Sequence, residues 1–251
     1  MQRPDFSASY LRKTADLIAS HPEDVAMSQA VGANFYATGA LEFLILKQEG
    51  LRPHHVVIDA GCGSGRLAVN LADYLEGGYV GIDVVPDLYR YAERLCNRPD
   101  WRFYTAPGTN IPEPDASADF IVFFSVFTHL LHEETYRYLQ DSVRVLKPGG
   151  KIVFSFLEYV IPSHWSVFES SVQDTNPGKV LNQFIDRDMI RGFAKRLGMV
   201  VSSIHDGDKP HITLDRTITF DDGREVSGTY NLGQSVCVLS KPVDHKSYIG
   251  S

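Results

Sequence analysis

The sequence has few cysteines and no long apolar run. Cys62, Cys96 and Cys237 are odd in number and far apart, so they predict no disulfide framework and favour a reducing, cytoplasmic location. The longest apolar runs, at 120–127 and 152–157, fall well short of the about 20 residues that a transmembrane helix needs. Charged side chains interrupt the first twenty residues, so we expect no secretory signal there.

Positive charge is also scarce. The chain carries 24 basic and 31 acidic side chains, a formal net charge of −7, and no run of Lys or Arg exceeds two residues. Proteins that bind a nucleic-acid backbone usually present a basic patch, so we expect no nucleic-acid partner. With 251 residues and 43% hydrophobic side chains, the chain is long and apolar enough for one large folded domain.

From residue 55 onward, short apolar strands alternate with helical segments. Strands are predicted at 56–59, 79–83, 101–105 and 120–126, and a fifth from Lys151. Near-continuous apolar strands separated by helices are typical of a parallel sheet covered on both faces. Right-handed crossovers then give a doubly wound α/β sheet.

The two ends of the chain differ from this pattern. Three helices are predicted before residue 54, near 10–20, 24–31 and 38–50. After residue 157 the segment 158–183 has no clean period, and a helix at 186–197 and strands at 199–204 and 235–240 follow. Asp221-Asp222-Gly223 predicts a hairpin between the last two strands.

A glycine-rich turn follows the first strand of this alternating region. It reads Gly61-Cys62-Gly63-Ser64-Gly65, directly after Asp59. Glycines allow a sharp turn and a close ligand approach, and the helix start offers unpaired N–H groups to an anionic group. The Asp59 carboxylate suits an ammonium group. An anion site at the helix start beside an ammonium site at Asp59 predicts that an amino-acid moiety binds here. The alternative is a tight strand–helix turn that binds nothing.

Asp83 ends the second strand, about 20 residues further along. Rossmann-type folds place an acidic residue there to bind ribose hydroxyls. The alternative is a turn or helix-capping role before Val84-Val85-Pro86. The distance from the glycine loop favours the ribose role.

Residues 55–157 resemble a class I S-adenosylmethionine-dependent methyltransferase. Four segments carry the resemblance in order: the glycine loop, Tyr79-Val80-Gly81-Ile82-Asp83, residues 111–120, and Leu146-Lys147-Pro148-Gly149-Gly150-Lys151. The resemblance implies a Rossmann-like seven-stranded sheet in the order 3-2-1-4-5-7-6, with strand seven antiparallel. It also implies one domain over 1–251, with a helical cap at 1–53, a cofactor-binding core at 54–157 and substrate-cover insertions at about 158–183 and 207–232.

The resemblance also assigns roles to residues of this chain. The cofactor is S-adenosylmethionine, and its product S-adenosylhomocysteine. Asp59 would lie near its amino group, Asp83 would hold its ribose and Val84 would cover its adenine. Many relatives carry an Asp where this chain has Pro107. Further cofactor contacts are implied at Gly61, Cys62, Gly63, Gly65, Gly108, Thr109, Phe124 and Ser125.

Three residues are candidates for catalysis. His129 follows the fourth strand and titrates near neutral pH, which suits a general base, although it could also cap or pack beside the next helix. Tyr36 and His164 belong to aromatic clusters that could form the acceptor site. The spacing of His129, His132 and Glu133 is unconvincing for a metal site, so we expect no metal.

These observations predict methyl transfer to an oxygen or nitrogen atom of a small-molecule, saccharide or lipid-linked acceptor. One alternative is a methyltransferase-like module that binds a partner without catalysis. Another is a nucleotide-dependent oxidoreductase, but its GxGxxG loop would place the third glycine one residue after Gly65. The sequence leaves the acceptor and the oligomeric state open.

Overall fold

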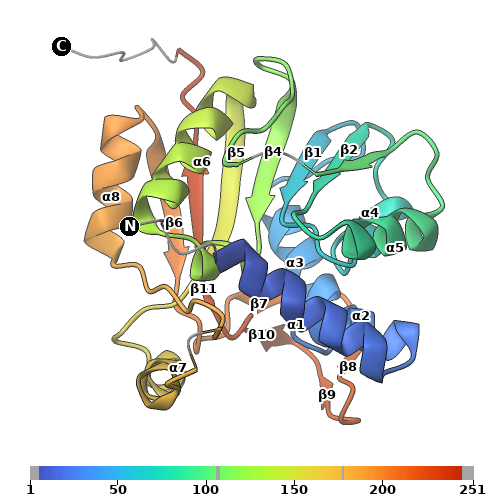
Figure 1. The fold of residues 1–251 in the computed structure, drawn as a ribbon. Coiled ribbons are helices and arrows are strands. Elements are labelled where there is room, and N and C mark those ends of the chain that lie inside the picture. Colours follow the sequence, from blue (N-terminus) through green and yellow to red (C-terminus); the bar gives the residue numbers. More distant parts are fainter. Residues whose placement is uncertain (1–5, 106–107, 177, 245–251) are drawn as a thin grey trace.

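Seven strands form one mixed sheet in the computed structural model, which describes residues 6–105, 108–176 and 178–244 (Figure 1). Their order is β3-β2-β1-β4-β5-β11-β6, and β11 runs antiparallel to both β5 and β6. The strand order and the antiparallel strand predicted from the sequence are therefore confirmed. The strands are β1 Val56–Ala60, β2 Gly78–Ile82, β3 Arg102–Tyr104, β4 Ala118–Phe123, β5 Leu146–Phe156, β6 Val200–His205 and β11 Ser235–Ser240.

Helices cover both faces of this sheet. Helices α3 (Phe35–Gln48) and α4 (Ala68–Ala72) pack with Val57 in one buried cluster. Helices α6 (His132–Val145) and α8 (Arg187–Arg196) pack with Ile58 in the other. Because successive strand residues point to opposite faces, one run of apolar residues supplies both cores. Helix α5 (Pro86–Cys96) follows β2.

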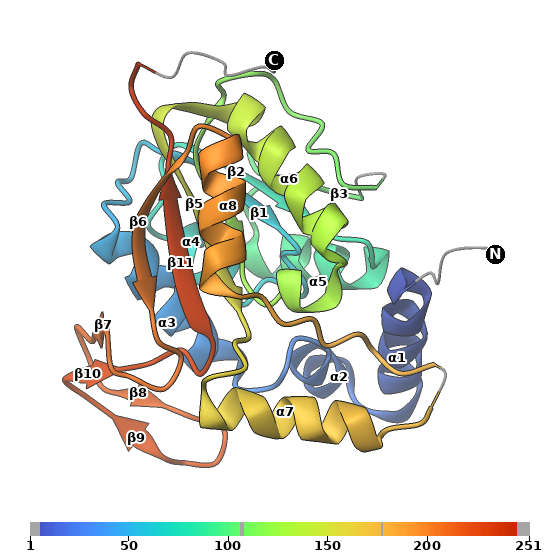
Figure 2. The same ribbon diagram turned by 90° about the vertical axis from the view of Figure 1, so that its left-hand side faces the viewer.

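The remaining elements gather at the end of the sheet where the parallel strands finish (Figures 1 and 2). Most of them come from the beginning of the chain and from the part after β5, and one short 3-10 helix follows β4. They are α1 (Phe6–Ser20), α2 (Glu23–Ala30), the short 3-10 helix Phe127–His129, α7 (Pro162–Gln173), β7 (Ile212–Thr213), β8 (Ile218–Thr219), β9 (Glu225–Val226) and β10 (Thr229–Tyr230). Strands β8 and β9 form the predicted hairpin.

Two expectations for local structure differ from what is found. The segment predicted without a period contains α7, in which His164 is the one buried residue, so no apolar face repeats along it. Strand β5 begins at Leu146 rather than Lys151. A register shift between Ala118 and Phe120 of the paired strand accommodates the glycine-containing segment. In the part of the chain that the structure describes, no helix could cross a membrane.

Candidate active site

The glycine loop is tied to the end of β2 by backbone hydrogen bonds. The N–H groups of Gly61 and Cys62 both donate to the Ile82 carbonyl, at 2.7 and 3.0 Å. The Gly63 N–H donates to Asp83 Oδ2 at 2.8 Å. The loop and the end of the second strand therefore form one rigid unit.

Gly61 and Gly63 are the two glycines of this loop that face the cavity. Gly61 and Gly63 have φ values of +85° and +53°. A Cβ added at Gly61 would lie 2.3 Å from Val126 Cγ2, and one at Gly63 would lie 2.5 Å from Val31 Cγ1. Since both valines line the adjoining cavity, the loop forms a cradle that a side chain would fill. This geometry fits the close approach of a ligand.

That cavity has a volume of about 490 Å³ and opens at the carboxyl ends of the parallel strands. This volume is within the usual range for ligand pockets, and the position is the one at which open α/β sheets bind ligands. It brings together most of the residues singled out from the sequence: Asp59, Gly61, Cys62, Gly63, Asp83, Val84, Gly108, Thr109, Phe124, Ser125 and His129. Gly65 does not line it. An added Cβ there would lie 2.7 Å from Ala92 Cβ, so Gly65 permits close packing of the loop against α5.

Two buried carboxyl groups give the cavity its electrostatic character. Burial raises the pKa of Asp59 to about 7, although a hydrogen bond from Tyr79 partly opposes it. Burial raises the pKa of Asp83 to about 6, against the N–H groups of Val85 and Gly63 that stabilise the carboxylate. A ligand that brings an ammonium or hydroxyl donors would favour the ionised forms.

A buried ion pair that was not predicted from the sequence forms another wall of the cavity. Arg66 Nη2 lies 2.6 Å from Glu42 Oε1 on α3 and 3.2 Å from Ser125 Oγ. Burial raises the pKa of Glu42, while Arg66 opposes this rise. Arg66 follows the glycine loop directly, so its position in the motif was the available signal.

The N-terminal helices close the cavity from outside. Tyr10, Lys13 and Val31 line it. The Tyr10 hydroxyl donates to the Ala30 carbonyl at 2.8 Å, which joins α1 to the end of α2. The Tyr10 ring lies 5.9 Å from the His129 ring. The predicted helical cap is therefore part of the cavity wall.

His129 is held with one ring nitrogen bound. Its Nδ1 lies 2.7 Å from the Leu181 carbonyl, so Nδ1 carries a proton and donates. Burial lowers the pKa of His129, and the Lys13 cation lowers it further, against the Leu181 bond. A neutral imidazole with an unprotonated Nε2 at the cavity is the result.

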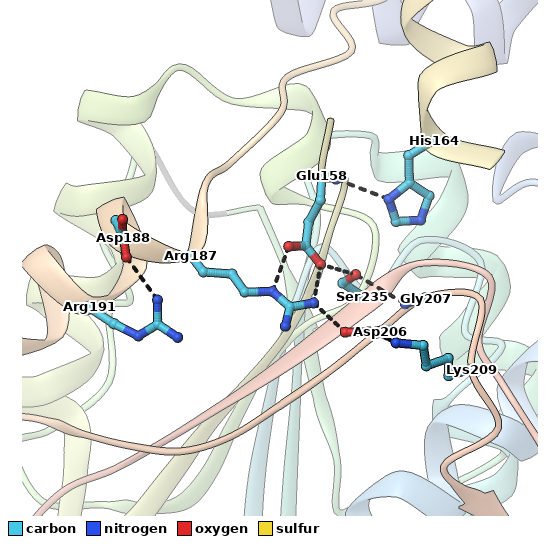
Figure 3. Close-up of polar contacts among 9 residues, drawn as sticks. All are labelled: Glu158, His164, Arg187, Asp188, Arg191, Asp206, Gly207, Lys209 and Ser235. Carbon is cyan, nitrogen blue, oxygen red and sulfur yellow. Dashed lines mark hydrogen bonds and ion pairs between the residues drawn. The ribbon is translucent and has the colours of Figure 1, made fainter. Parts of the chain in front are cut away.

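The structure does not bring Tyr36 and His164 to the cavity. Tyr36 is 67% exposed at the start of α3. His164 is buried on α7, where Nδ1 accepts from the Glu158 N–H at 3.0 Å and Nε2 lies 3.0 Å from the Gly233 carbonyl (Figure 3). Both ring nitrogens of His164 therefore form hydrogen bonds to backbone groups. Among the described residues, no group of three or more His, Cys, Asp or Glu side chains could hold a metal ion.

A serine–glutamine pair on the far side of the cavity was also missed from the sequence. The Ser125 N–H donates to Ser155 Oγ, which donates to Gln234 Oε1, both at 2.7 Å. Ser125 has a φ of +59°, which turns the chain out of β4. These residues are 30 and 79 positions apart, so no local pattern could link them.

Comparison with known proteins identifies a matching family for the central part of the chain. Residues 58–154 match the methyltransferase domain family. A tRNA (carboxymethyluridine(34)-5-O)-methyltransferase from Arabidopsis thaliana is 27% identical over 61% of this chain and 33% of its own length. A demethylmenaquinone methyltransferase from Tropheryma whipplei is 31% identical over 43% of this chain and 44% of its own. The chain thus spans less than half the length of these relatives.

A solved structure shows the same fold over nearly the whole chain. The magnesium protoporphyrin IX methyltransferase of Synechocystis PCC 6803, with bound SAH, superposes with a TM-score of 0.63. The match covers 93% of this chain and 97% of that one at 14% identity. It includes the N-terminal and C-terminal thirds as well as the central strands.

Proposed function

Because the chain carries a class I S-adenosylmethionine-dependent methyltransferase domain over residues 58–154, we propose that it transfers a methyl group to an oxygen or nitrogen atom of a small-molecule, saccharide or lipid-linked acceptor. One observation carries this proposal. A single cavity contains the glycine cradle, two buried carboxyl groups and a histidine with a free nitrogen. An amino-acid ligand and a reacting nucleophile can therefore meet in the same enclosed space.

The glycine loop and the two carboxyl groups are proposed to hold S-adenosylmethionine. In this proposal Asp59 binds its ammonium group, the loop binds its methionine portion and Asp83 binds its ribose hydroxyls. Val84, Gly108 and Thr109 line the cavity where its adenine would lie, whereas Pro107 is outside the described residues. When bound, the cofactor supplies an activated methyl group on a sulfonium. The protein would then need to align the acceptor atom with that methyl group and exclude water.

His129 is the proposed general base. Its Nδ1–H is committed to the Leu181 carbonyl, which leaves the lone pair on Nε2 to accept a proton. Because burial lowers its pKa, the ring is neutral at physiological pH. An acceptor hydroxyl or amine beside Nε2 would lose its proton to this atom. His164 and Tyr36 have no part in this proposal, since neither lines the cavity.

The size and cover of the cavity support a small acceptor. Tyr10 and Lys13 of α1 and Val31, which follows α2, form part of its wall, so the N-terminal segment covers part of the cavity. The net charge of −7 weakens electrostatic attraction to nucleic acid. A compact acceptor held inside the cavity is consistent with both observations.

Calorimetric titration of the purified protein with S-adenosylhomocysteine tests the proposal. The wild type should bind it, and NAD should show no binding. Gly61→Ala should weaken binding at least about tenfold, because a misfitted Cβ costs on the order of 1–3 kcal/mol. Gly223→Ala is the matched control: it has a φ of +81° and nothing within 4 Å of its added Cβ.

Binding of NAD instead of S-adenosylhomocysteine would favour the oxidoreductase alternative. Binding of neither would favour a module without cofactor. If Gly61→Ala and Gly223→Ala bind as the wild type does, the cradle is not where the ligand lies.

A further inference from the structure

The cavity spans several neighbouring strands, and its two halves are built differently. The glycine loop and Asp83 follow β1 and β2. Ser125 follows β4, Ser155 lies on β5 and Gln234 precedes β11, on the other side of β1 in the sheet. Phe124 and Ser125 are implied cofactor contacts at the end of β4, but Gln234 belongs to none of the cofactor motifs. Its side chain is therefore available to the methyl acceptor.

Hydrogen bonding fixes the orientation of the Gln234 side chain. Ser155 is fully buried, and its hydroxyl oxygen already accepts from the Ser125 N–H at 2.7 Å. The one hydroxyl proton needs an acceptor, and Gln234 Oε1 lies 2.7 Å away. The amide oxygen thus faces Ser155. The Nε2 group, which has no hydrogen-bond partner among the described residues, belongs to a side chain that lines the cavity.

The backbone on both sides of Gln234 is also held by hydrogen bonds, and Figure 3 shows those on the Ser235 side. His164 Nε2 lies 3.0 Å from the Gly233 carbonyl, and its other nitrogen accepts from a backbone N–H, so Nε2 carries the proton and donates. Ser235 Oγ donates to Glu158 Oε1 at 2.5 Å, and Arg187 binds both oxygens of Glu158 at 2.6 and 2.8 Å. Such support is what a preorganised recognition group requires.

We propose that the Gln234 amide is the group that recognises the methyl acceptor, donating from Nε2 to a carbonyl or carboxylate oxygen of that molecule. This inference rests on the proposed function. Phe124, Leu130 and Val180 line the same cavity, so the oxygen belongs to a molecule with an apolar body, for which small ring compounds are convenient probes. An acceptor without such an oxygen leaves a polar donor unpaired and binds less well.

Three ring compounds serve as probes of this donor: benzamide, benzoate and toluene. Each is titrated into protein saturated with S-adenosylhomocysteine, and binding is followed by ligand-observed NMR. Wild-type protein should bind benzamide and benzoate about three- to tenfold more tightly than toluene, the effect of one hydrogen bond. Gln234→Glu keeps an oxygen for Ser155 and replaces the donor by a carboxylate. The Gln234→Glu variant should no longer bind benzamide and benzoate more tightly than toluene. Its affinity for benzoate should fall most, because two carboxylates repel each other.

Two further variants separate recognition from folding. Ser155→Ala frees the Gln234 amide to rotate and should reduce the preference for benzamide without reversing it. Gln140→Glu, an exposed position on α6, should behave as the wild type does. The affinity for S-adenosylhomocysteine should be unchanged in Gln234→Glu and Gln140→Glu, which also shows that they fold. Ser155→Ala removes the acceptor of the Ser125 N–H, so the folding of this variant is checked by circular dichroism.

Three results would overturn the inference: equal binding of toluene and benzamide by the wild type, an unchanged preference in Gln234→Glu, or no ring compound bound at millimolar concentration. Failure of the proposed function looks different. In that case the wild type does not bind S-adenosylhomocysteine, and the same probes are compared on the ligand-free protein.

Discussion

The half of the cavity next to β1 and β2 and the half next to β4, β5 and β11 reach a fixed geometry by different means. In the first, residues 59–83 supply nearly everything, through positive φ values and backbone hydrogen bonds. In the second, Lys13, His129, Ser155 and Gln234 come from distant parts of the chain. Hydrogen bonds fix His129 and Gln234, and the ion pair between Arg187 and the buried Glu158 supports the backbone beside Gln234. A local motif is enough to hold the cofactor, which many enzymes share. Recognition of the acceptor, which differs between enzymes, depends on residues that only the tertiary structure brings together.

The largest expected effect comes from breaking the ionic support of the second half. Arg187 contacts Glu158, which is 3% exposed, and also pairs with Asp206. Arg187→Met should lower the free energy of unfolding by about 3 kcal/mol, because it leaves a buried carboxylate without its cation. Urea denaturation followed by circular dichroism measures this change.

Arg191→Met is the matched control for that variant, one turn further along α8. Arg191 pairs with the exposed Asp188 (Figure 3), and an exposed ion pair contributes about 0–1 kcal/mol. The affinity for S-adenosylhomocysteine should change little in either variant, since the first half of the cavity does not contact this network. Equal destabilisation by the two variants would show that the buried network is not what holds the second half.

A smaller effect is expected from the charge of Asp83 in the first half. Its pKa of about 6, raised by burial, means that protonation competes with ribose binding below that pH. The affinity for S-adenosylhomocysteine should rise about tenfold from pH 5 to pH 7 through this group and level off above pH 7. The difference between wild type and Asp83→Asn, measured by calorimetry across this range, isolates the contribution of this carboxyl group from that of Asp59.

Ligand-free stability provides the control, with its sign fixed by the same pKa. Because the pKa is higher in the folded state than in the unfolded chain, the folded protein binds more protons between about pH 4 and 6. The free energy of unfolding contributed by Asp83 therefore falls as the pH rises through this window. Asp83→Asn should flatten that fall. If the slope is the same in both proteins, the carboxyl group is not as deeply desolvated as its burial indicates.

Local patterns allowed a doubly wound sheet and the glycine loop to be predicted, whereas the order of the strands was implied by the resemblance to a methyltransferase family. Alternating strands and helices identify the sheet, and Gly61 and Gly63 occupy positions that require glycine. Helix α7 was missed because its buried residue, His164, defines no apolar face. Gln234 was missed because its role depends on Ser155, 79 positions away. The exposure of Tyr36 likewise depends on packing that no local pattern reveals.

The smallest expected effect concerns the N-terminal helix α1 and His129. It tests whether Lys13 on α1 changes the pKa of the proposed general base. The Lys13 cation lowers the pKa of His129, as a smaller contribution beside burial. Lys13→Gln should therefore raise that pKa, although burial keeps it below its usual value. An NMR pH titration of the His129 ring measures it and shows the Nδ1–H tautomer that the bond to Leu181 requires. Lys195→Gln on α8 is the control, and an identical His129 pKa in all three proteins would mean that α1 covers the cavity without acting on its base.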